Sequence, residues 1–253
     1  MTAYAEELRS RLDVLPYVVD VFCGDGGAGH GYLAGGATVF GIDLNRNHGK
    51  RYPGPFWPGD WRAGLDRIRS NPYLRQPDLV HLSPPCQRFT HGNVANGQAE
   101  RHPDLIGPVR DYMLEWGVPF VIENVERAPL NDAVMFCGTM FGLEADDPAS
   151  GHRLVLKRHR LFEAHGFTLT PPGPCRCLEH RRAGRVIGGV YGGARSDLTE
   201  ARTIRRGGYV PADKAVRAAL LGVDPDGFTL GGLSEAIPPA YATRVLRCFL
   251  ESR

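Results

Sequence analysis

Long apolar runs are missing from this sequence, and nowhere do the ~18 consecutive apolar residues of a transmembrane helix occur. The first residues, MTAYAEELRSRLDVLPY, lack the apolar segment of a secretory signal, so we expect none. Cysteine is scarce, with 6 in 253 residues, which excludes a disulfide scaffold and favours a reduced, cytoplasmic setting. The content of 42% hydrophobic and 23% charged residues excludes disorder, collagen and coiled coil as global descriptions.

Acidic charge is depleted in one stretch of the chain. Residues 151–210 carry 12 Lys/Arg against 4 Asp/Glu, whereas residues 1–150 carry 13 against 19. A basic face without a partner is about as frequent as one that binds a polyanion. The basic side chains here are nearly all arginine, which forms paired hydrogen bonds with phosphate and with guanine edges, and this favours nucleic acid.

Glycine and proline are abundant, with 32 Gly and 20 Pro, so long loops are expected between the regular elements. Strands are predicted at Tyr17–Phe22, Thr38–Asp43, Asp78–Ser83, Phe120–Glu123 and Val186–Tyr191. Helices are predicted at Ala3–Leu15, just after Gly31, and at Asp104–Trp116, Pro211–Leu221 and Pro239–Leu250. This alternation predicts an α/β fold with a largely parallel sheet. The Pro-, Gly- and Arg-rich stretch from Phe167 to Gly208 predicts a small irregular second lobe.

A glycine-rich turn follows the first predicted strand. Gly24-Asp25-Gly26-Gly27-Ala28-Gly29 fits G-x-G-x-x-G, and Asp43 ends the next strand about 20 residues on. In that arrangement backbone N–H groups approach a nucleotide while the carboxylate holds the ribose hydroxyls. The pattern suits a nicotinamide cofactor or S-adenosylmethionine, and Asp60 is a candidate third contact, for instance to an adenine amino group.

The sharpest signal is Ser83-Pro84-Pro85-Cys86-Gln87, at the end of a predicted strand. Ligands of open α/β sheets bind at the carboxyl ends of the strands, and two prolines make a rigid mount for a nucleophile. A lone cysteine is usually a small buried apolar side chain. The proline mount and the long polar loop from Gln87 to Gly107, which could close over a substrate, favour a reactive one here.

Two further motifs supply an acid and cations. Glu123-Asn124-Val125 follows a buried strand, where a desolvated carboxylate acquires a raised pKa and can donate a proton. Arg158-His159-Arg160 offers cationic donors to a carbonyl or phosphate oxygen. With Cys86 they describe one chemistry. A thiolate adds to an electron-poor ring carbon, an acid bonds the ring nitrogen and an arginine holds the ring oxygen, so that a methyl donor alkylates the adjacent carbon.

These motifs, in this order, resemble those of the cytosine-C5 DNA methyltransferases, in the small bacterial or phage form with a short target-recognition region. The matching segments are Asp20–Gly27, Gly41–Asp43, Gly59-Asp60, Pro84–Gln87, Glu123–Val125, Phe136–Gly138 with Phe141–Leu143, Arg158–Phe162 and Ala236–Pro239. The resemblance implies a Rossmann-like S-adenosylmethionine-dependent methyltransferase sheet with a small irregular second lobe. It also implies three parts: residues 1–162 for catalysis and cofactor binding, 163–208 for target recognition, and 209–253 returning to the catalytic domain.

The resemblance also implies roles for single residues. Among the catalytic residues Cys86, Glu123, Arg158 and Arg160, Cys86 would attack C6 of cytosine and Glu123 would bond N3 and the exocyclic amine. Arg160 would contact O2, with Arg158 supporting the site. The residues implied to contact S-adenosylmethionine are Phe22, Cys23, Gly24, Asp25, Gly26, Gly27, Asp43, Leu44, Asp60, Trp61, Pro85, Glu235, Ala236 and Ile237.

Double-stranded DNA is the implied partner, and the target cytosine must leave the helix to reach Cys86. The expected DNA contacts are Gln87, Arg88 and Thr90 in the closing loop, and Arg181, Arg182, Arg185 and Arg195 in the basic lobe. The short lobe predicts a small footprint with a short or relaxed sequence context. We expect a cytoplasmic monomer that binds no membrane, with a cognate restriction endonuclease as a candidate companion.

The sequence departs from the family in two motifs. Leu156 stands where the arginine motif usually begins with Gln, and Ser234-Glu235 replaces the usual Gly-Asn, which brings a negative charge near the cofactor.

Cys175-x-Cys177 with His180 could supply three zinc ligands. A fourth ligand is not evident and C-x-C spacing is atypical of structural zinc sites, so the prediction from these residues is that no metal is bound.

Three other functions stay open on the sequence. The same chemistry could methylate cytosine in RNA instead of DNA. A catalytically silent DNA-binding accessory subunit is a second alternative, against which the intact Cys86, Glu123 and Arg160 argue. A nicotinamide oxidoreductase is compatible with the glycine turn but has no use for the Pro-Pro-Cys-Gln mount.

Overall fold

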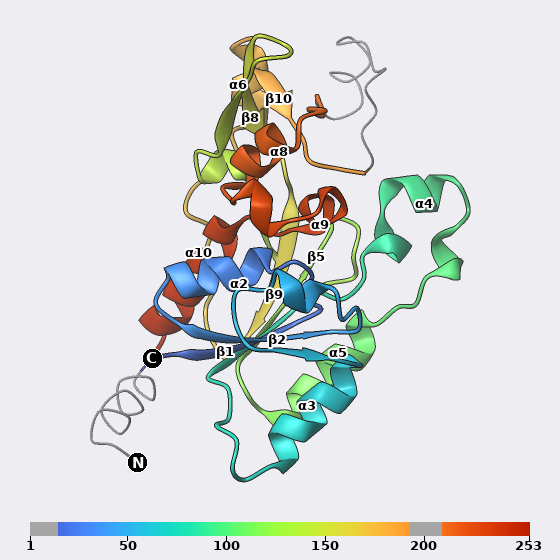
Figure 1. Ribbon diagram of the computed structural model, residues 1–253, viewed down its shortest axis with the longest axis vertical. Coiled ribbons are helices and arrows are strands. Elements are labelled where there is room, and N and C mark those ends of the chain that lie inside the picture. Colours follow the sequence, from blue (N-terminus) through green and yellow to red (C-terminus); the bar gives the residue numbers. More distant parts are fainter. Residues whose placement is uncertain (1–14, 193–208) are drawn as a thin grey trace.

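In a computed structural model, residues 15–192 and 209–253 are described, and the helix expected at Ala3–Leu15 falls almost wholly outside them. A seven-stranded sheet lies at the centre, with helices on both faces and a smaller lobe at one end (Figure 1). Within the described residues, no helix is long and apolar enough to cross a bilayer.

The large sheet has the strand order β3-β2-β1-β4-β5-β9-β6. The strands β3, β2, β1, β4 and β5 pair in parallel, whereas β9 pairs antiparallel with both β5 and β6. The bounds are β1 Tyr17–Val21, β2 Thr38–Asp43, β3 Phe56–Pro58, β4 Leu79–Leu82, β5 Phe120–Asn124, β6 Val134–Phe136 and β9 Arg160–His165. The α/β fold with a largely parallel sheet is therefore confirmed, and four of its strands lie where the sequence predicts them.

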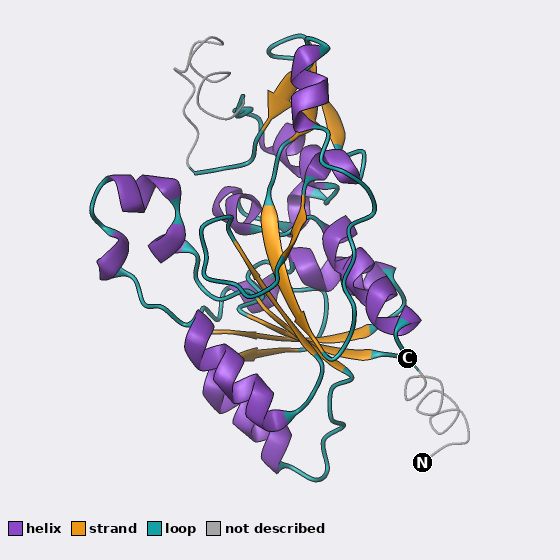
Figure 2. Ribbon diagram, turned by 180° about the vertical axis from the view of Figure 1, so that it is seen from behind, coloured by secondary structure: helices purple, strands orange, loops and turns teal. Residues whose placement is uncertain are grey.

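Both faces of this sheet are covered by helices, which explains why its strands are nearly continuous apolar runs. Helices α2 (Gly27–Ala34) and α10 (Pro239–Glu251) pack on one face, where Val18 and Leu79 meet Tyr241. Helices α3 (Trp61–Ser70) and α5 (Ile106–Trp116) pack on the other face, against residues that alternate with these along β1 and β4 (Figure 2). Pro108 lies in the first turn of α5, where a missing N–H costs no helical hydrogen bond.

Close packing between α2 and α10 depends on glycine. A β-carbon added to Gly31 would lie 2.1 Å from the carbonyl oxygen of Pro239, and one added to Gly27 would lie 2.4 Å from that of Ile237. Gly27 and Gly31 therefore admit the C-terminal segment, because neither carries a side chain that would collide with it.

The smaller lobe is built on a second sheet with the order β10-β8-β7. Its strands are β7 (Glu144–Asp147), β8 (His152–Leu156) and β10 (Val186–Gly188), so two of them precede residue 162 and one follows it. Helices α8 (Lys214–Leu221) and α9 (Leu230–Glu235) close its apolar core, and α6 (Cys177–Arg182) lies beside β10. The three-part division at residues 162 and 208 stays a prediction.

Short helical turns fill the connections. They are η1 His48–Lys50, η2 Gln87–Phe89, α4 His91–Ala95, η3 Ala99–Arg101, η4 Gly138–Met140 and η5 Pro225–Gly227. Three of them, η2, α4 and η3, belong to the long loop after Cys86, and Figures 1 and 2 both show α4 standing away from the sheet.

Candidate active site

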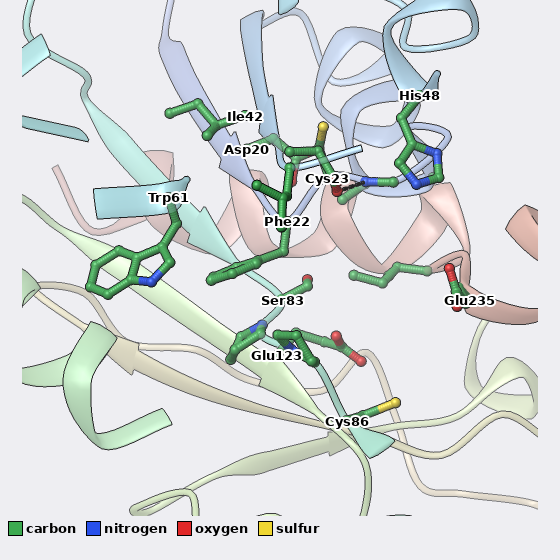
Figure 3. A pocket seen from close by; sticks show the side chains of 18 of the residues that line it. Asp20, Phe22, Cys23, Ile42, His48, Trp61, Ser83, Cys86, Glu123 and Glu235 are labelled. Carbon is green, nitrogen blue, oxygen red and sulfur yellow. Dashed lines mark hydrogen bonds between the residues drawn. The ribbon is translucent and has the colours of Figure 1, made fainter. Parts of the chain in front are cut away.

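A cavity of about 430 Å³ opens where the parallel strands β1, β2, β4 and β5 end (Figure 3). Its size is that of a pocket for a small molecule or cofactor. Every predicted cofactor-binding residue except Gly26 lines this cavity, together with Cys86, Gln87, Glu123 and Arg160. The sequence motifs, which are scattered from residue 22 to residue 237, therefore converge on one place.

The glycine turn and the acid after β2 are joined directly. The backbone N–H of Gly24 donates to Oδ2 of Asp43 at 3.0 Å, and that of Asn45 donates to Oδ1 at 2.9 Å. Gly26 has φ 94°, a left-handed conformation that glycine adopts without strain, and it ends the turn where α2 begins. Gly26 thus shapes the turn without lining the cavity.

Phe22 begins the turn in a conformation unusual for a residue with a side chain. Its φ of 59° lies in the left-handed region, which costs on the order of 1 kcal/mol and is typical of functional sites. This backbone turn aims the ring into the cavity, where its centroid lies 6.4 Å from the ring of Trp61. Asp60 precedes Trp61 and caps α3, because its Oδ1 accepts hydrogen bonds from the N–H groups of Arg62 and Ala63.

Asp25 lines the cavity, and both of its carboxylate oxygens make contacts within the protein. Its Oδ2 accepts from the backbone N–H of Thr229 at 2.9 Å and from the Thr229 hydroxyl at 3.0 Å. Its Oδ1 lies 2.7 Å from Nδ1 of His48. Burial alone would raise its pKa, but these hydrogen bonds outweigh burial and hold the pKa below its usual value. Asp25 therefore anchors the C-terminal segment to the glycine turn.

The nucleophile candidate Cys86 lies in the other half of the cavity, near Glu123 (Figure 3). Burial raises the pKa of its thiol, and the charge of Glu123 raises it further. The guanidinium groups of Arg160 and Arg158 act in the opposite direction. Formation of a thiolate at this site is therefore favoured by the arginines and by a proton on Glu123.

Glu123 and Arg160 form a buried ion pair, with 2.9 Å between Nε of Arg160 and Oε1 of Glu123. Burial raises the pKa of Glu123, and the charges of Arg160 and Arg158 oppose that rise, as does a hydrogen bond with Ser83. A buried acid with a raised pKa can be a proton donor near neutral pH. The acid, the cation and the thiol therefore lie together in one part of the cavity.

The backbone that carries Cys86 is held by neighbouring side chains. Asn124 donates its amide to the carbonyl oxygen of Pro84 at 2.9 Å. Fully buried His81 lies 2.7 Å from the Tyr32 hydroxyl and 3.0 Å from the Ser83 hydroxyl, and burial lowers its pKa to about 3. A neutral His81 thus connects α2 to the start of the Pro-Pro-Cys mount.

Arg158, expected among the catalytic residues, does not line the cavity. Its side chain is fully buried and donates to the carbonyl oxygens of Val190 at 2.6 Å and Ser234 at 2.9 Å. The Arg158 carbonyl accepts from the Tyr241 hydroxyl at 2.7 Å. Burial lowers the pKa of Arg158 to about 10. Its guanidinium therefore joins the segments that contain Val190 and Ser234, and it does not line the cavity.

The expected DNA contacts lie in different environments. Gln87 lines the cavity, Arg88 donates to the carbonyl oxygen of His102 at 3.1 Å, and Thr90 caps α4. Arg181 and Arg182 are exposed on α6, whereas the guanidinium of Arg185 is paired with Glu144 at 2.7 Å. The remaining residue, Arg195, lies outside the described residues.

Other cavity residues were not expected from the sequence: Asp20, Ala28, Ile42, His48, Gly59, Ser83, Pro84, Pro103, Leu105, Gly232 and Ser234. Asp20, Ile42, Gly59 and Pro84 lie within the matching segments and Ser83 is adjacent to one, so the motifs themselves are the signal for these residues although no contact was assigned to them. His48 and Gly232 carry no such signal, because the folding of distant segments brings them to the cavity.

Asp20 provides a pH-dependent test of this part of the core. It is fully buried in β1, and burial raises its pKa to about 8. An aspartate in the unfolded chain has a pKa of about 4. Between about pH 4 and pH 8 the folded state therefore holds a proton on Asp20 that the unfolded chain has lost. The contribution of Asp20 to the free energy of unfolding is fully present below about pH 4 and is lost as pH rises to about 8. Over this range the free energy of unfolding falls by up to about 1.4 kcal/mol per pH unit.

Asp20→Asn is expected to remove that slope from the free energy of unfolding, measured by urea denaturation at several pH values. Exposed Asp111 is the matched control, and Asp111→Asn is expected to leave the pH profile unchanged. Parallel profiles for the wild type and Asp20→Asn would show that Asp20 does not hold the extra proton.

Comparison with known proteins shows the fold. No family model matches the sequence, and no curated protein matches it either. Three solved structures, each covering nearly the whole chain, have the same fold. One is an E. coli prophage protein assigned as a DNA modification methyltransferase, with a TM-score of 0.57 and 13% identity over 94% of this chain and 99% of that one. Another is S. pombe Dnmt2 methyltransferase, with a TM-score of 0.56 and 12% identity over 93% of this chain and 98% of that one. The third is Entamoeba histolytica methyltransferase EhMeth, with a TM-score of 0.52 and 10% identity over 94% of this chain and 98% of that one. The expected Rossmann-like methyltransferase fold is confirmed.

Proposed function

We propose that this protein is a DNA cytosine-C5 methyltransferase, which transfers a methyl group from S-adenosylmethionine to C5 of a flipped-out cytosine. The observation that carries the proposal is the convergence of Cys86, Glu123 and Arg160 on the cavity that the glycine turn also lines. Those three side chains form the acid, cation and nucleophile that addition to a pyrimidine requires. The fold shared with methyltransferases of known structure agrees with this chemistry.

The residues in the half of the cavity around the glycine turn fit S-adenosylmethionine. Asp43 presents a carboxylate beside the glycine turn, where it accepts from the Gly24 N–H. An added β-carbon at Gly24 would meet nothing within 4 Å, so the turn is open to a ligand at this residue. Phe22 and Trp61 offer aromatic surface for an adenine ring. Glu235, which departs from the family, adds a carboxylate at the cavity edge, where it would attract a cationic sulfonium.

The residues of the other half would act on the base. Cys86 would form a bond from Sγ to C6, and Glu123 would donate a proton or hydrogen bond to N3 as charge moves onto the ring. Arg160 would stabilise the developing charge at O2. The electron pair displaced by sulfur makes C5 nucleophilic, and bound S-adenosylmethionine supplies the methyl group. The bond from the methyl group to the sulfonium sulfur would break as the bond to C5 forms, which leaves S-adenosylhomocysteine. A base, such as solvent water, would then take the C5 proton, and the electron pair released would expel the Cys86 thiolate and restore the ring.

The departure at Leu156 does not affect this site. Leu156 is fully buried in β8, in the core of the smaller lobe, and does not line the cavity. A glutamine at that position would therefore need a different course of the chain to reach the base.

Incubation of the full chain with S-adenosylmethionine and either duplex DNA or tRNA tests the proposal. Expression in a methylation-free bacterial host, followed by bisulfite sequencing of the host DNA, would then give the sequence context. Methylated cytosine in the DNA supports the proposal. Transfer to tRNA alone would replace it with the RNA alternative, and binding of a nicotinamide cofactor without S-adenosylmethionine, measured by calorimetry, would exclude both.

Contact between DNA and the smaller lobe can be tested on α6. Arg181 and Arg182 are exposed, so the double Arg181→Ala/Arg182→Ala variant is expected to weaken DNA binding and to reduce the slope of log affinity against log salt by about 2. Arg185 is left in place because it pairs with Glu144 inside the lobe. Exposed Arg67 on α3, at the opposite end of the molecule, is the control (Figure 1). An unchanged salt slope in the double variant would remove α6 from the interface.

A further inference from the structure

Four side chains that the catalytic site does not use meet at the base of the smaller lobe. They are Cys137, His159, Cys175 and Cys177, and their ligand atoms all lie within 4.8 Å of one another. Cys137 precedes η4, His159 lies between β8 and β9, and the other two cysteines lie at the start of α6. Three segments far apart in the sequence therefore contribute to one cluster, so the cluster does not arise merely because its residues are neighbours in the chain.

The spacing of these atoms fits a single tetrahedral ion. Sγ of Cys137 lies 3.4 Å from Sγ of Cys177, and Nε2 of His159 lies 3.4 Å from Sγ of Cys175 and 3.6 Å from Sγ of Cys177. Ligands on zinc at 2.0–2.3 Å in a tetrahedron are separated by about 3.5–3.8 Å. The three cysteines are free, and the sulfur atoms of Cys137 and Cys177 are farther apart than the ~2.05 Å of a disulfide.

The imidazole of His159 is oriented for metal binding. Its Nδ1 lies 2.8 Å from Oε1 of Glu126, so a proton on Nδ1 is held by the carboxylate. The unprotonated Nε2 then faces the sulfur atoms of Cys175 and Cys177. A carboxylate behind a metal-binding histidine is the usual device that fixes its tautomer and ring plane.

The sulfur atoms also have a supporting partner. The hydroxyl of Thr139 lies 3.4 Å from Sγ of Cys137 and 3.8 Å from Sγ of Cys175, and it accepts from the backbone N–H of Arg176 at 3.0 Å. Hydrogen bonds of this kind stabilise thiolates around a metal. The cluster thus has both its ligands and the groups that hold them.

We propose that Cys137, His159, Cys175 and Cys177 bind one Zn²⁺ as a structural site. Three thiolates and one imidazole favour zinc over hard cations such as Mg²⁺ and Ca²⁺. On binding, three Zn–S bonds and one Zn–N bond form, and the thiol protons pass to solvent. Four protein ligands leave no position for water or substrate, so the ion holds the chain together and takes no part in methyl transfer.

The site ties the smaller lobe to the arginine motif. His159 lies between Arg158 and Arg160, and the guanidinium of Arg160 donates to the His159 carbonyl at 2.9 Å. An ion on His159 would therefore fix the backbone from which Arg160 reaches Glu123, while Cys175 and Cys177 bring the start of α6 to the same point. His180, which the sequence suggested as a ligand, is not in the cluster and instead contacts Arg185.

Metal content and cobalt spectroscopy of the full chain test this proposal. Protein purified without chelator is expected to carry one zinc ion per chain by mass spectrometry of the metal. After exchange, Co²⁺ should give the strong visible bands of tetrahedral coordination and the near-ultraviolet sulfur-to-cobalt band. Cys177→Ser is expected to lose the zinc, whereas Cys248→Ala and His180→Ala, which change a cysteine and a histidine outside the cluster, should retain it.

Glu126→Gln gives a milder test that does not remove a ligand. The variant is expected to weaken zinc affinity by about 10- to 100-fold, measured by competition with a chromophoric chelator. Wild-type protein that binds neither Zn²⁺ nor Co²⁺ with its thiols reduced would overturn the proposal, as would a disulfide between two of the cluster cysteines in freshly purified protein. Because these readouts are independent of methylation, they stand whether or not the proposed function holds.

Discussion

Cys86→Ala is expected to abolish methyl transfer while leaving S-adenosylmethionine binding intact. The proposed reaction requires a bond between sulfur and C6 of the base, and alanine offers no atom that can form it. We therefore expect the rate of methyl transfer to fall by at least about 10³-fold, the scale on which loss of a nucleophile acts in other enzymes. Cofactor affinity should persist because the glycine turn, Asp43 and Trp61 lie in the other half of the cavity.

Three measurements separate this expectation from general damage. Transfer of labelled methyl groups to DNA reports the rate, calorimetry reports cofactor binding, and DNA carrying 5-fluorocytosine should trap wild-type protein, but not Cys86→Ala, as a covalent adduct. Cys248→Ala, a change in the buried face of α10, is the control for loss of a thiol. Normal turnover by Cys86→Ala would refute the assignment of Cys86 as the nucleophile.

Replacing each arginine of the arginine motif by methionine is expected to have a different effect, on stability for Arg158 and on activity for Arg160. Arg158→Met should destabilise the fold, because the carbonyl oxygens of Val190 and Ser234 would lose their buried donors. Each unsatisfied carbonyl costs about 1–3 kcal/mol, so the loss in the free energy of unfolding should be about 2–6 kcal/mol. Methyl transfer would then fall through loss of folded protein.

Arg160→Met should keep most of the stability and lose the activity. Glu123 would lose its ion-pair partner, but a buried carboxylate can take up a proton and become neutral, which limits the cost. The base would lose its cationic contact. Denaturant unfolding and single-turnover kinetics on both variants check the contrast. A stable, inactive Arg158→Met protein would show that Arg158 acts on the reaction directly.

Several strands could be predicted because their sequences are apolar runs bounded by turn residues. Strand β9 could not, since RLFEAH carries three ionisable residues. Glu163 in its middle is 1% exposed and accepts two hydrogen bonds from Arg110 at 2.7 Å. That pairing brings together residues 53 positions apart, so no local pattern reveals that a strand with such a residue is buried.

The candidate site shows the same division. Asp43 and Glu123 each end a predicted strand and Cys86 follows another, and strands that run in parallel end at the same edge of a sheet. The order of strands and motifs along the chain was therefore enough to expect these three residues to meet. The anchoring of Asp25 by Thr229, 204 residues away, and the withdrawal of Arg158 from the cavity depend on the path of the whole chain.

By itself, the sequence determined four strands of the large sheet, the glycine turn after the first of them and the residues at their ends, because these follow from short-range periodicity and backbone preference. Only the tertiary structure decided which polar side chains face the cavity and which hold the chain together. It also decided that Cys137 and His159, rather than His180, join Cys175 and Cys177. The reason is that hydrogen bonds and metal ligands act over a few ångströms in space, and distance along the chain does not limit them.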